Sequence, residues 1–314
     1  MPLEQWGAHG SSARTSQQVP FRHFRRVSPA PRSVFWFAFL FPIPMLIRHV
    51  PVKSILTASK LPGCDFAANP YVGCPHACRY CYAVYMKRFT DHPEPWGTFL
   101  DVKEAPPLTH PEKYRGKSVF LSSVTDAYNP YEAEFRKTRE LLEQLVDLGV
   151  SLGITTKSNL VLRDLDLLKQ FESVQVAFSI NTLDEAFRRD MDRASTIAER
   201  IEAMQILHDN GIPTVTFISP IFPVLTRVFD IIEATHDVCD EVWLENLNLR
   251  ACNRGVILGY IHQHHPQLNR LYDDIYLRKD YTYWHELSQS VEAYAVENGI
   301  CLRNYLHADV REGE

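Results

Sequence analysis

The amino-acid sequence predicts an α/β protein whose main domain is a partial (β/α)6 barrel, similar to a TIM barrel that stops after six units. Two observations predict this fold. Apolar, β-branched runs alternate with segments of helical periodicity, and six such units occupy about 190 of the 314 residues. Strands that alternate with helices pair in parallel through right-handed crossovers. Because a complete barrel needs eight units, an open barrel is expected.

The six expected strands are short runs rich in Val, Ile, Phe and Thr, bounded by polar or turn-forming residues. The first of them leads into a loop that contains three cysteines. They are residues 66–72, 118–124, 150–157, 173–182, 212–221 and 241–249.

Helices are expected between these strands. Leucines at helical spacing predict a helix over residues 132–148, and Gly149 is expected to end it. Thr196 with Glu199 three residues later resembles a capping box, which begins a helix running to Gly211. The other expected helices cover residues 163–171, 228–238 and 284–298, and a final strand is expected over residues 300–306.

Residues 1–45 differ in composition from the rest of the chain. They are rich in Ser, Arg, Pro and Gln, and the apolar run 34–47 is interrupted by prolines and too short to span a bilayer comfortably. A membrane anchor and a disordered arm with an apolar patch are two interpretations. We favour a third, in which Met45 is the native start and the preceding leader is poorly ordered and dispensable. The expected domains are then a barrel over residues 50–250 and an extension over residues 251–314 packed on it.

Composition and charge are typical of a globular protein from a reducing compartment. Hydrophobic residues make up 45% of the chain and charged residues 23%. Seven cysteines are too few for a disulfide scaffold, and so a cytoplasmic location is expected. Residues 1–50 hold six of the 33 Lys and Arg residues and one of the 38 Asp and Glu residues, which leaves residues 51–314 with a net charge of −10. This charge disfavours wide, non-specific binding to nucleic acid, and no membrane binding is expected.

Three cysteines stand together in the loop after the first expected strand. Cys74, Cys78 and Cys81 are separated by three and then two residues, in a polar loop that does not resemble core packing. A structural zinc site is one interpretation, with His76 or Cys64 as the fourth ligand. Thiolates also hold iron–sulfur clusters, and three of them would leave one iron of a [4Fe–4S] cluster without a protein donor.

The spacing of these cysteines, with Tyr80 as the aromatic residue before the third, resembles the signature of the radical S-adenosylmethionine (SAM) superfamily. The resemblance implies a partial barrel of that type and a [4Fe–4S] cluster whose fourth iron chelates SAM. It further implies reductive cleavage of SAM to a 5′-deoxyadenosyl radical. A reductant protein such as flavodoxin or ferredoxin is then an expected partner.

Further stretches resemble the spore-photolyase-like branch of that superfamily and cover roughly residues 50–250. They are NPYVGCPHACRYCYA (69–83), SSVTDAYNPYE (122–132), TTKS (155–158), SINT (179–182) and GIPTVTFISPIFP (211–223). The stretch from SILTAS (54–59) through MKRFTDHPEPWGTFLDVKEAP (86–106) is similar to radical SAM mobile pair protein B, a family encoded on bacterial mobile elements beside a second radical SAM enzyme. That second protein is therefore another expected partner.

The resemblance to spore photolyase assigns roles to individual residues beyond the three cluster cysteines. Tyr82 matches a tyrosine implicated in hydrogen transfer, and Tyr80 is expected beside the cofactor. Lys157 and Ser179 match a lysine and a serine that bind the SAM carboxylate. An ammonium and a hydroxyl at strand ends can orient a carboxylate. Judged by residue type alone, Lys157 is a solvated cation and Ser179 a strand-end cap, so both interpretations stay open.

One segment departs from the spore-photolyase pattern. That family places a hydrogen-donor cysteine at the end of the second barrel strand, where this chain has Ser122 and Ser123. A serine O–H bond is too strong to replace a thiol donor, and direct reversal of a thymine dimer is therefore disfavoured. Ser123 and Asp126 are expected to contact cofactor or substrate, or else to cap the approach to the helix at Glu132.

The predicted function is a radical SAM enzyme that abstracts hydrogen from a substrate the sequence does not name. A lyase or repair enzyme acting on nucleic acid is one alternative, and action on a peptide, small molecule or partner protein is another. The net charge and the missing thiol favour the latter. A non-enzymatic zinc-binding module is the third alternative.

Other polar residues are weaker candidates. Three of them end expected strands and could face the barrel mouth: Asn181, Glu245 and Asn246. Four cysteines outside the motif are expected to pack, although one could donate hydrogen: Cys64, Cys239, Cys252 and Cys301. The tract of His262, His264 and His265 is interpreted as a solvated turn.

Overall fold

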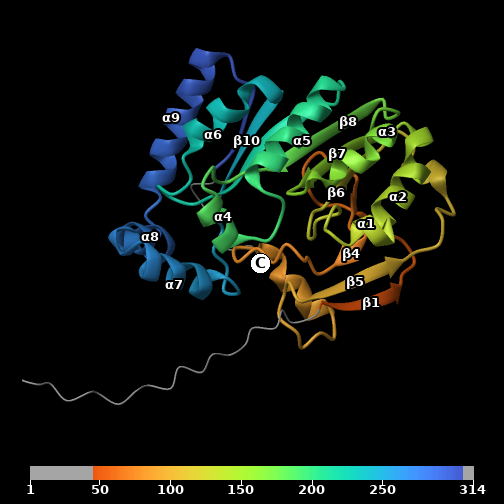
Figure 1. The fold of residues 1–314 in the computed structure, drawn as a ribbon, viewed down its shortest axis with the longest axis horizontal. Coiled ribbons are helices and arrows are strands. Elements are labelled where there is room, and N and C mark those ends of the chain that lie inside the picture. Colours follow the sequence, from red (N-terminus) through yellow and green to blue (C-terminus); the bar gives the residue numbers. More distant parts are fainter. Residues whose placement is uncertain (1–44, 307–314) are drawn as a thin grey trace, which may run out of the picture. The chain divides into compact units, whose positions relative to one another are not determined.

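The computed structural model describes residues 45–306 of the protein. The predictions made for residues 1–44, and those for residues 307–314 of the extension, lie outside this range. The described chain forms two sheets, and helices surround the larger one (Figure 1).

The larger sheet has eight strands in the order β11-β10-β9-β8-β7-β6-β3-β2. Neighbours from β3 to β11 pair in parallel, whereas β2 is antiparallel to β3. Six of these strands, β3 and β6 to β10, are the predicted barrel strands, and β2 and β11 are the open edges. The α/β partial barrel is therefore confirmed. The bounds are β2 (Leu56–Ala58), β3 (Phe66–Ala68), β6 (Ser118–Leu121), β7 (Ser151–Thr156), β8 (Ser173–Ser179), β9 (Thr214–Ile221), β10 (Glu241–Asn246) and β11 (Leu302–Tyr305).

Helices follow the barrel strands in the predicted alternation, and α2, α3, α5, α6 and α9 lie along the outer side of the sheet (Figure 1). Alternate strand residues such as Ile154, Val176 and Ile218 are fully buried beneath them, together with Leu141 and Leu142 of α2. The bounds are α1 (Glu132–Phe135), α2 (Lys137–Leu145), α3 (Leu165–Leu168), α4 (Glu185–Met191), α5 (Ile197–Asp209), α6 (Val228–Thr235), α7 (Arg254–His264), α8 (Asn269–Tyr276) and α9 (Thr282–Asn298).

The predicted capping box begins α5. The Thr196 hydroxyl accepts a hydrogen bond from the Glu199 backbone N–H at 3.2 Å, and the Glu199 carboxylate accepts one from the Thr196 N–H at 2.7 Å. Two of the free N–H groups at the helix start are thus satisfied by neighbouring side chains. This local chemistry explains why the start of α5 could be predicted from sequence.

A second, three-stranded sheet was not predicted. It consists of β1 (Leu46–Pro51), β5 (Phe99–Glu104) and β4 (Tyr71–Val72), with β5 in the centre. β1 is parallel to β5 and β4 is antiparallel to it. Most of this sheet comes from the long connection between the first two barrel strands, which also contains the 3-10 helices η1 (Tyr82–Phe89) and η2 (Pro111–Tyr114).

The expected single strand over residues 66–72 is wrong in one respect, because it divides into β3 and β4, which belong to different sheets. The division falls at Asn69 and Pro70. Pro70 has no N–H for a ladder hydrogen bond. The Asn69 side chain instead binds the second-strand loop, accepting from the Val124 N–H at 3.0 Å and donating to the Ser123 hydroxyl at 2.8 Å.

The expected continuous helix over residues 132–148 is also wrong, because it is interrupted at Arg136, which has a left-handed φ of 53°. The buried Glu132 carboxylate accepts from the backbone N–H groups of Thr138 and Arg139 and so caps α2 from within. These hydrogen bonds at the start of α2 offset the conformational free energy that the left-handed region costs at Arg136. The last turn is the 3-10 helix η3 (Val146–Leu148), and Gly149 ends it at a φ of 60°, as predicted.

The extension after residue 250 contains the predicted helix α9 and the predicted strand β11, which pairs with β10. It also contains α7 and α8, which were not predicted. His262 and His264 lie within α7, so the interpretation of the histidine tract as a turn is wrong. Among the described residues, no helix combines the length and apolar character needed to cross a bilayer.

Candidate functional site

The three motif cysteines lie in a loop between β4 and η1, just beyond the carboxyl end of β3. Two glycines allow this loop to pack closely against its neighbours. A Cβ on Gly73, which has a φ of 88°, would collide with the Phe99 carbonyl oxygen, and a Cβ on Gly97 would come within 2.5 Å of the Ala77 Cβ. Only glycine tolerates such an approach. The small sheet therefore holds one side of the cysteine loop.

The end of α4 holds the other side of the loop. The Arg79 N–H donates to the Met191 carbonyl at 2.9 Å, and the Arg193 N–H donates to the His76 carbonyl at 2.8 Å. The chain segments 76–79 and 191–193 thus run side by side. The loop is pinned by backbone hydrogen bonds from a helix more than 100 positions away in the sequence.

The thiols of the loop lie close to one another and are shielded from solvent. Cys74 is 8% exposed, and Cys78 and Cys81 are partly buried. Burial raises the pKa of Cys74 well above its usual value, with further increases from Cys78, Asp126 and Cys81. Burial also raises the pKa of Cys78 to about 12. Metal coordination favours the thiolate form of cysteine. Three neighbouring thiols with raised pKa values would therefore all lose their protons when they bind a metal centre.

An indole beside the loop provides a test of whether these residues fit the predicted cluster. The Trp96 Nε1–H is buried and has no hydrogen-bond partner among the described residues. Burial raises the pKa of Cys81, whereas the backbone N–H of Ala83, Lys157 and the Trp96 side chain lower it. The Trp96 N–H therefore lies close to the Cys81 sulfur, although its geometry does not meet the criteria of a hydrogen bond. Three soft thiolates with a donor beside one of them match the ligands and hydrogen bonds of an iron–sulfur cluster.

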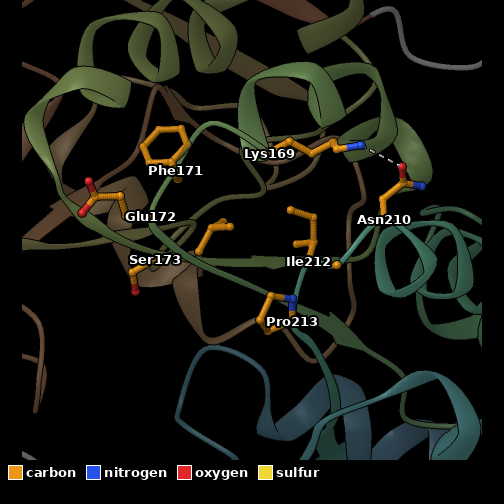
Figure 2. A pocket seen from close by; sticks show the side chains of 9 residues that line it. Lys169, Phe171, Glu172, Ser173, Asn210, Ile212 and Pro213 are labelled. Carbon is orange, nitrogen blue, oxygen red and sulfur yellow. Dashed lines mark hydrogen bonds between the residues drawn. The ribbon is translucent and has the colours of Figure 1, made fainter.

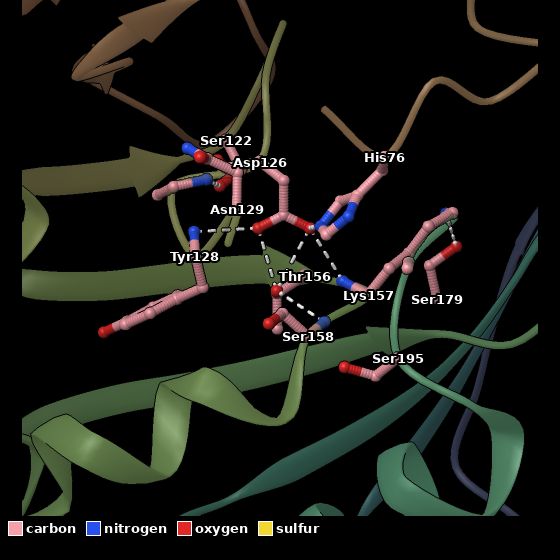
Figure 3. A network of polar contacts seen from close by, with 12 residues as sticks. His76, Ser122, Asp126, Tyr128, Asn129, Thr156, Lys157, Ser158, Ser179 and Ser195 are labelled. Atoms are coloured by element: carbon pink, nitrogen blue, oxygen red, sulfur yellow. Dashed lines mark hydrogen bonds and ion pairs between the residues drawn. The ribbon is translucent and has the colours of Figure 1, made fainter. Parts of the chain in front are cut away.

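Asp126 lies at the centre of a buried polar network that joins the cysteine loop to β7 (Figure 3). Its carboxylate accepts from the Thr156 hydroxyl, and from the Lys157 and Tyr128 backbone N–H groups, all at 2.9 Å. His76 Nε2 lies 3.1 Å away as an ion-pair partner without hydrogen-bond alignment. Burial by itself would raise the pKa of Asp126, but His76 and the backbone N–H groups bring it below the usual value. This carboxylate thus orients a residue of the cysteine loop and the backbone of Lys157.

Lys157 and Ser179 meet at the carboxyl ends of β7 and β8 (Figure 3). The Lys157 ammonium donates to the Ser179 hydroxyl, which in turn donates to the Ser219 carbonyl at 2.8 Å. The ammonium also lies 5.7 Å from the centre of the Tyr80 ring. Within the described residues, Lys157 has no carboxylate partner in an ion pair. It is therefore a cation available to an anionic ligand, next to a hydroxyl.

Tyr80 is buried on the inner side of the cysteine loop. Its hydroxyl donates to Asp192 at 3.1 Å, and Asp192 is in turn paired with the fully buried Arg200 at 3.1 Å. Arg200 also donates to the Ser179 carbonyl at 2.9 Å. These buried groups connect the tyrosine of the motif to the strand end that carries Ser179. Asp192 and Arg200 were not among the predicted site residues, because the sequence around neither of them indicates its partner.

Tyr82 follows the third cysteine and is 43% exposed. Its hydroxyl donates to the Ser123 carbonyl. Partial burial raises the pKa of Tyr82, and the Glu245 carboxylate and the Cys81 thiol raise it further. The phenol is therefore neutral at physiological pH. Glu245 accepts a hydrogen bond from the Ser219 hydroxyl at 2.6 Å, and it lies near enough to Tyr82 to raise the pKa of that tyrosine.

The remaining candidate residues at the strand ends differ in their hydrogen bonds. Asn181 is 1% exposed and its side-chain nitrogen has no hydrogen-bond partner among the described residues. Asn246 is buried at the end of β10. The Ser122 hydroxyl accepts from the Ala127 N–H at 2.8 Å, so it stabilises the turn after β6.

The four cysteines outside the motif lie at two edges of the sheet. Cys64, Cys239 and Cys301 precede β3, β10 and β11, at the amino ends of these parallel strands. Cys252 is exposed in the segment that follows β10, on the carboxyl side. Within residues 45–306, no three His, Cys, Asp or Glu side chains are gathered around the position of a single metal ion, the histidine tract included. Cysteines that bind a [4Fe–4S] cluster do not share one ion, because each binds a different iron.

A cavity of about 380 Å³ lies at the opposite edge of the barrel (Figure 2). It is lined by the residues that lead into β8 and β9, including Phe171, Ile212 and Pro213, and Lys169 donates to Asn210 at 3.2 Å across it. These residues precede their strands. In barrels of this kind ligands bind at the carboxyl ends of the strands. The site is therefore assigned to the edge that carries Lys157 and Ser179.

Relatives of known sequence share most of the barrel. An uncharacterised protein of Methanocaldococcus jannaschii is 38% identical over 223 residues, which are 70% of this chain and 84% of that protein. An uncharacterised protein of Acidianus two-tailed virus is 34% identical over 171 residues, which are 50% of this chain and 56% of that protein.

Solved structures share the fold at low sequence identity. A spore photoproduct lyase variant with bound SAM and dinucleoside spore photoproduct aligns with a TM-score of 0.51 and 15% identity, over 70% of this chain and 66% of that one. Streptococcus suis SuiB bound to SAM aligns with a TM-score of 0.51 and 13% identity. That alignment covers 86% of this chain and 53% of SuiB, so this chain spans about half of that larger protein.

The family comparison matches the part of the chain that carries the site. The model of the radical SAM superfamily matches residues 68–233, which include the cysteine loop, Lys157 and Ser179. The matched range also contains four complete strands of the barrel sheet, β6, β7, β8 and β9, and the strands β4 and β5 of the small sheet. The match covers more than half of the chain. This protein belongs to the radical SAM superfamily.

Proposed function

We propose that this protein is an enzyme that holds a [4Fe–4S] cluster, cleaves SAM reductively and abstracts hydrogen from a substrate at the carboxyl edge of the barrel. One observation carries the proposal. Three neighbouring thiols lie in a pinned loop at the same edge of the sheet as an ammonium and a hydroxyl that converge at 157 and 179. This arrangement supports a site for a thiolate-ligated cluster beside a ligand with a carboxylate.

Each residue has a proposed role in that site. Cys74, Cys78 and Cys81 hold the cluster. Lys157 and Ser179 bind and orient the SAM carboxylate, and Asp126 holds the backbone at Lys157 in position. Tyr80 packs beside the cofactor, with its hydroxyl anchored on Asp192.

When bound, the cluster and SAM together supply a 5′-deoxyadenosyl radical by reductive cleavage of the sulfonium C–S bond. The barrel orients the reactants and excludes water. Tyr82 is positioned to move hydrogen, because its hydroxyl stays protonated and lies next to the Ser123 carbonyl at the edge of the site. The Ser123 hydroxyl also accepts a hydrogen bond from Asn69. The loop after β6 therefore contacts Tyr82 through the Ser123 carbonyl and contacts the end of β3 through the Ser123 side chain.

A nucleic-acid lyase is the second candidate, because the fold resembles that of spore photoproduct lyase. The residues at the end of β6 disfavour it. Ser122 and Ser123 occupy the place where the spore-photolyase pattern has a thiol donor, and both hydroxyls are engaged in hydrogen bonds within the protein. Of the other cysteines, only Cys252 lies on the carboxyl side of the barrel among the described residues. A peptide, small molecule or protein substrate is therefore favoured.

The proposed setting is the cytoplasm, with a flavodoxin- or ferredoxin-like reductant as one partner. A second radical SAM protein encoded nearby is a further proposed partner, on the basis of the mobile-pair-like stretch at residues 86–106. The reducing cytoplasm suits a chain with seven free cysteines.

Label transfer tests the proposed function. The full chain is reconstituted anaerobically with iron and sulfide, reduced with dithionite, and incubated with SAM and deuterated candidate substrates. We expect 5′-deoxyadenosine to form and to carry deuterium only when the true substrate class is present. A colourless protein with stoichiometric zinc, or a cluster-loaded protein that yields no 5′-deoxyadenosine under any reducing condition, would contradict the proposal.

Trp96→Phe is expected to lower the midpoint potential of the cluster. The substitution keeps an aromatic ring at this position but removes the N–H beside Cys81, and hydrogen bonds to ligand sulfur stabilise the reduced, more negative state. A hydrogen bond of about 1.4 kcal/mol corresponds to on the order of 60 mV for a one-electron couple. Potentiometric EPR titration measures the shift. Trp243→Phe, at a tryptophan bonded to Glu241 on β10, is the matched control and should leave the potential unchanged.

A further inference from the structure

The outer face of the cysteine loop carries exposed arginines. Arg79, between the second and third cysteines, is exposed, whereas the neighbouring Tyr80 side chain is buried in the barrel. Arg193 is exposed on the chain segment that runs beside the loop, joined to it by the two backbone hydrogen bonds at Met191 and His76. Arg189, on α4, is exposed as well. Three cations thus lie on or next to the segment that holds two cluster ligands.

These arginines form no ion pair within the described protein. Arg79 lies 5.9 Å from the centre of the Tyr260 ring in a cation–π contact, and the exposed Asp184 and Asp190 lie near the same tyrosine. The acidic side chains of the same region are already engaged. Asp184 caps α4, Glu185 binds Arg188, Asp190 accepts from the Tyr260 hydroxyl at 2.8 Å, and Asp192 is buried against Arg200.

The local charge contrasts with that of the rest of the chain. Residues 51–314 have a net charge of −10, so unpaired cations at the cluster loop run against the overall balance. The inner side of the loop, with Tyr80 and Cys78, faces Lys157 and Asp192. The cluster loop therefore has one side toward the proposed SAM site and another, basic side toward solvent.

We propose that the face formed by Arg79, Arg193 and Arg189 is the docking surface of an acidic one-electron donor protein, which reduces the cluster from its solvent side. The inference rests on the proposed function, because it requires a cluster at the cysteine loop. A positive patch attracts an acidic partner and raises its association rate, and the electron then enters next to the ligands Cys78 and Cys81. Nucleic acid is the less favoured occupant, since the overall charge of the chain opposes it.

The test compares a protein reductant with a small one. Arg79→Glu/Arg193→Glu, made in the full reconstituted chain, is reduced either by a reduced acidic flavodoxin or by dithionite, and cluster reduction is followed by EPR and by bleaching of the visible absorbance. We expect the flavodoxin-driven rate to fall at least about tenfold and to lose its dependence on salt. The dithionite-driven rate and dithionite-driven SAM cleavage should stay unchanged.

Controls separate the docking surface from charge and folding effects. Arg115→Glu/Lys169→Glu makes the same charge change at exposed residues of the amino-terminal edge and should reduce like the unmodified protein. Arg79→Gln/Arg193→Gln removes the charges without reversing them and should show a smaller loss. If the double Glu variant assembles less cluster, the flavodoxin-driven reduction rate of the Gln variant tests the docking proposal instead.

The possible failures are distinguishable. An unchanged flavodoxin-driven rate in both Arg79/Arg193 variants overturns the docking proposal but leaves the enzyme function intact. Loss of binding to a single-stranded oligonucleotide, with flavodoxin-driven reduction unaffected, would assign the face to nucleic acid instead. An unmodified protein that forms no reducible cluster with dithionite would overturn the proposed function and the docking surface together.

Discussion

Cys78→Ala is expected to abolish cluster assembly and SAM cleavage together. Two thiolates would then remain for a cluster that needs three, and the loop offers no replacement donor, because His76 is turned to Asp126. The measurements are iron and sulfide content, the EPR signal after reduction, and the yield of 5′-deoxyadenosine. We expect each to fall to background.

The matched control is Cys301→Ala. This cysteine is exposed and precedes β11 at the amino-terminal edge of the sheet, so its removal should leave both cluster and cleavage intact. Circular dichroism of both proteins without metal distinguishes lost ligation from lost folding. A Cys78→Ala protein that still holds a full, reducible cluster would show that the ligand assignment is wrong.

Lys157→Ala is expected to weaken SAM binding while the cluster remains. The ammonium is a donor without a carboxylate partner in the described protein, and a charge-assisted hydrogen bond to a ligand carboxylate contributes about 1.5–3 kcal/mol. The dissociation constant for SAM should therefore rise about ten- to hundredfold. Binding is measured by equilibrium dialysis or calorimetry with the oxidised cluster, which separates affinity from turnover.

Lys169→Ala is the control for this substitution, because that lysine binds Asn210 at the cavity on the amino-terminal edge. It should leave the affinity for SAM unchanged. If Lys157→Ala binds SAM as tightly as the unmodified protein, Lys157 is only a solvated cation. Loss of iron from Lys157→Ala would instead indicate that the lysine supports the cysteine loop, since it lowers the pKa of Cys78 and Cys81.

The order of strands and helices could be predicted from the sequence because it depends on local periodicity. The same is true of the start of α5 at Thr196, where the capping partners are three residues apart. The position of Lys157 and Ser179 at one edge also followed from sequence. Parallel strands bring their carboxyl ends together, so two residues that each end a strand must become neighbours.

Breaks inside expected elements could not be predicted in this way. The division at Pro70 depends on the separate sheet that β4 joins, and the interruption at Arg136 depends on a buried Glu132 that caps the following helix. In the first case a pairing strand from another part of the chain outweighs local propensity, and in the second a nearby side chain that only the tertiary fold buries does so. The small sheet was missed for the same reason, since β1 and β5 are about 50 residues apart and only their pairing makes them strands.

The sequence by itself determined the superfamily, because the three cysteines that resemble its signature are recognised by their spacing within one loop. Tertiary structure decided what surrounds them. Trp96 beside Cys81, Asp192 with Arg200 behind Tyr80, and Arg193 beside Arg79 all join positions without a shared local pattern. Contacts of this kind arise only when the packed core brings separate elements together. They turn a cysteine motif that could be read from the sequence into the three-dimensional site on which the proposed cofactor binding and electron transfer depend.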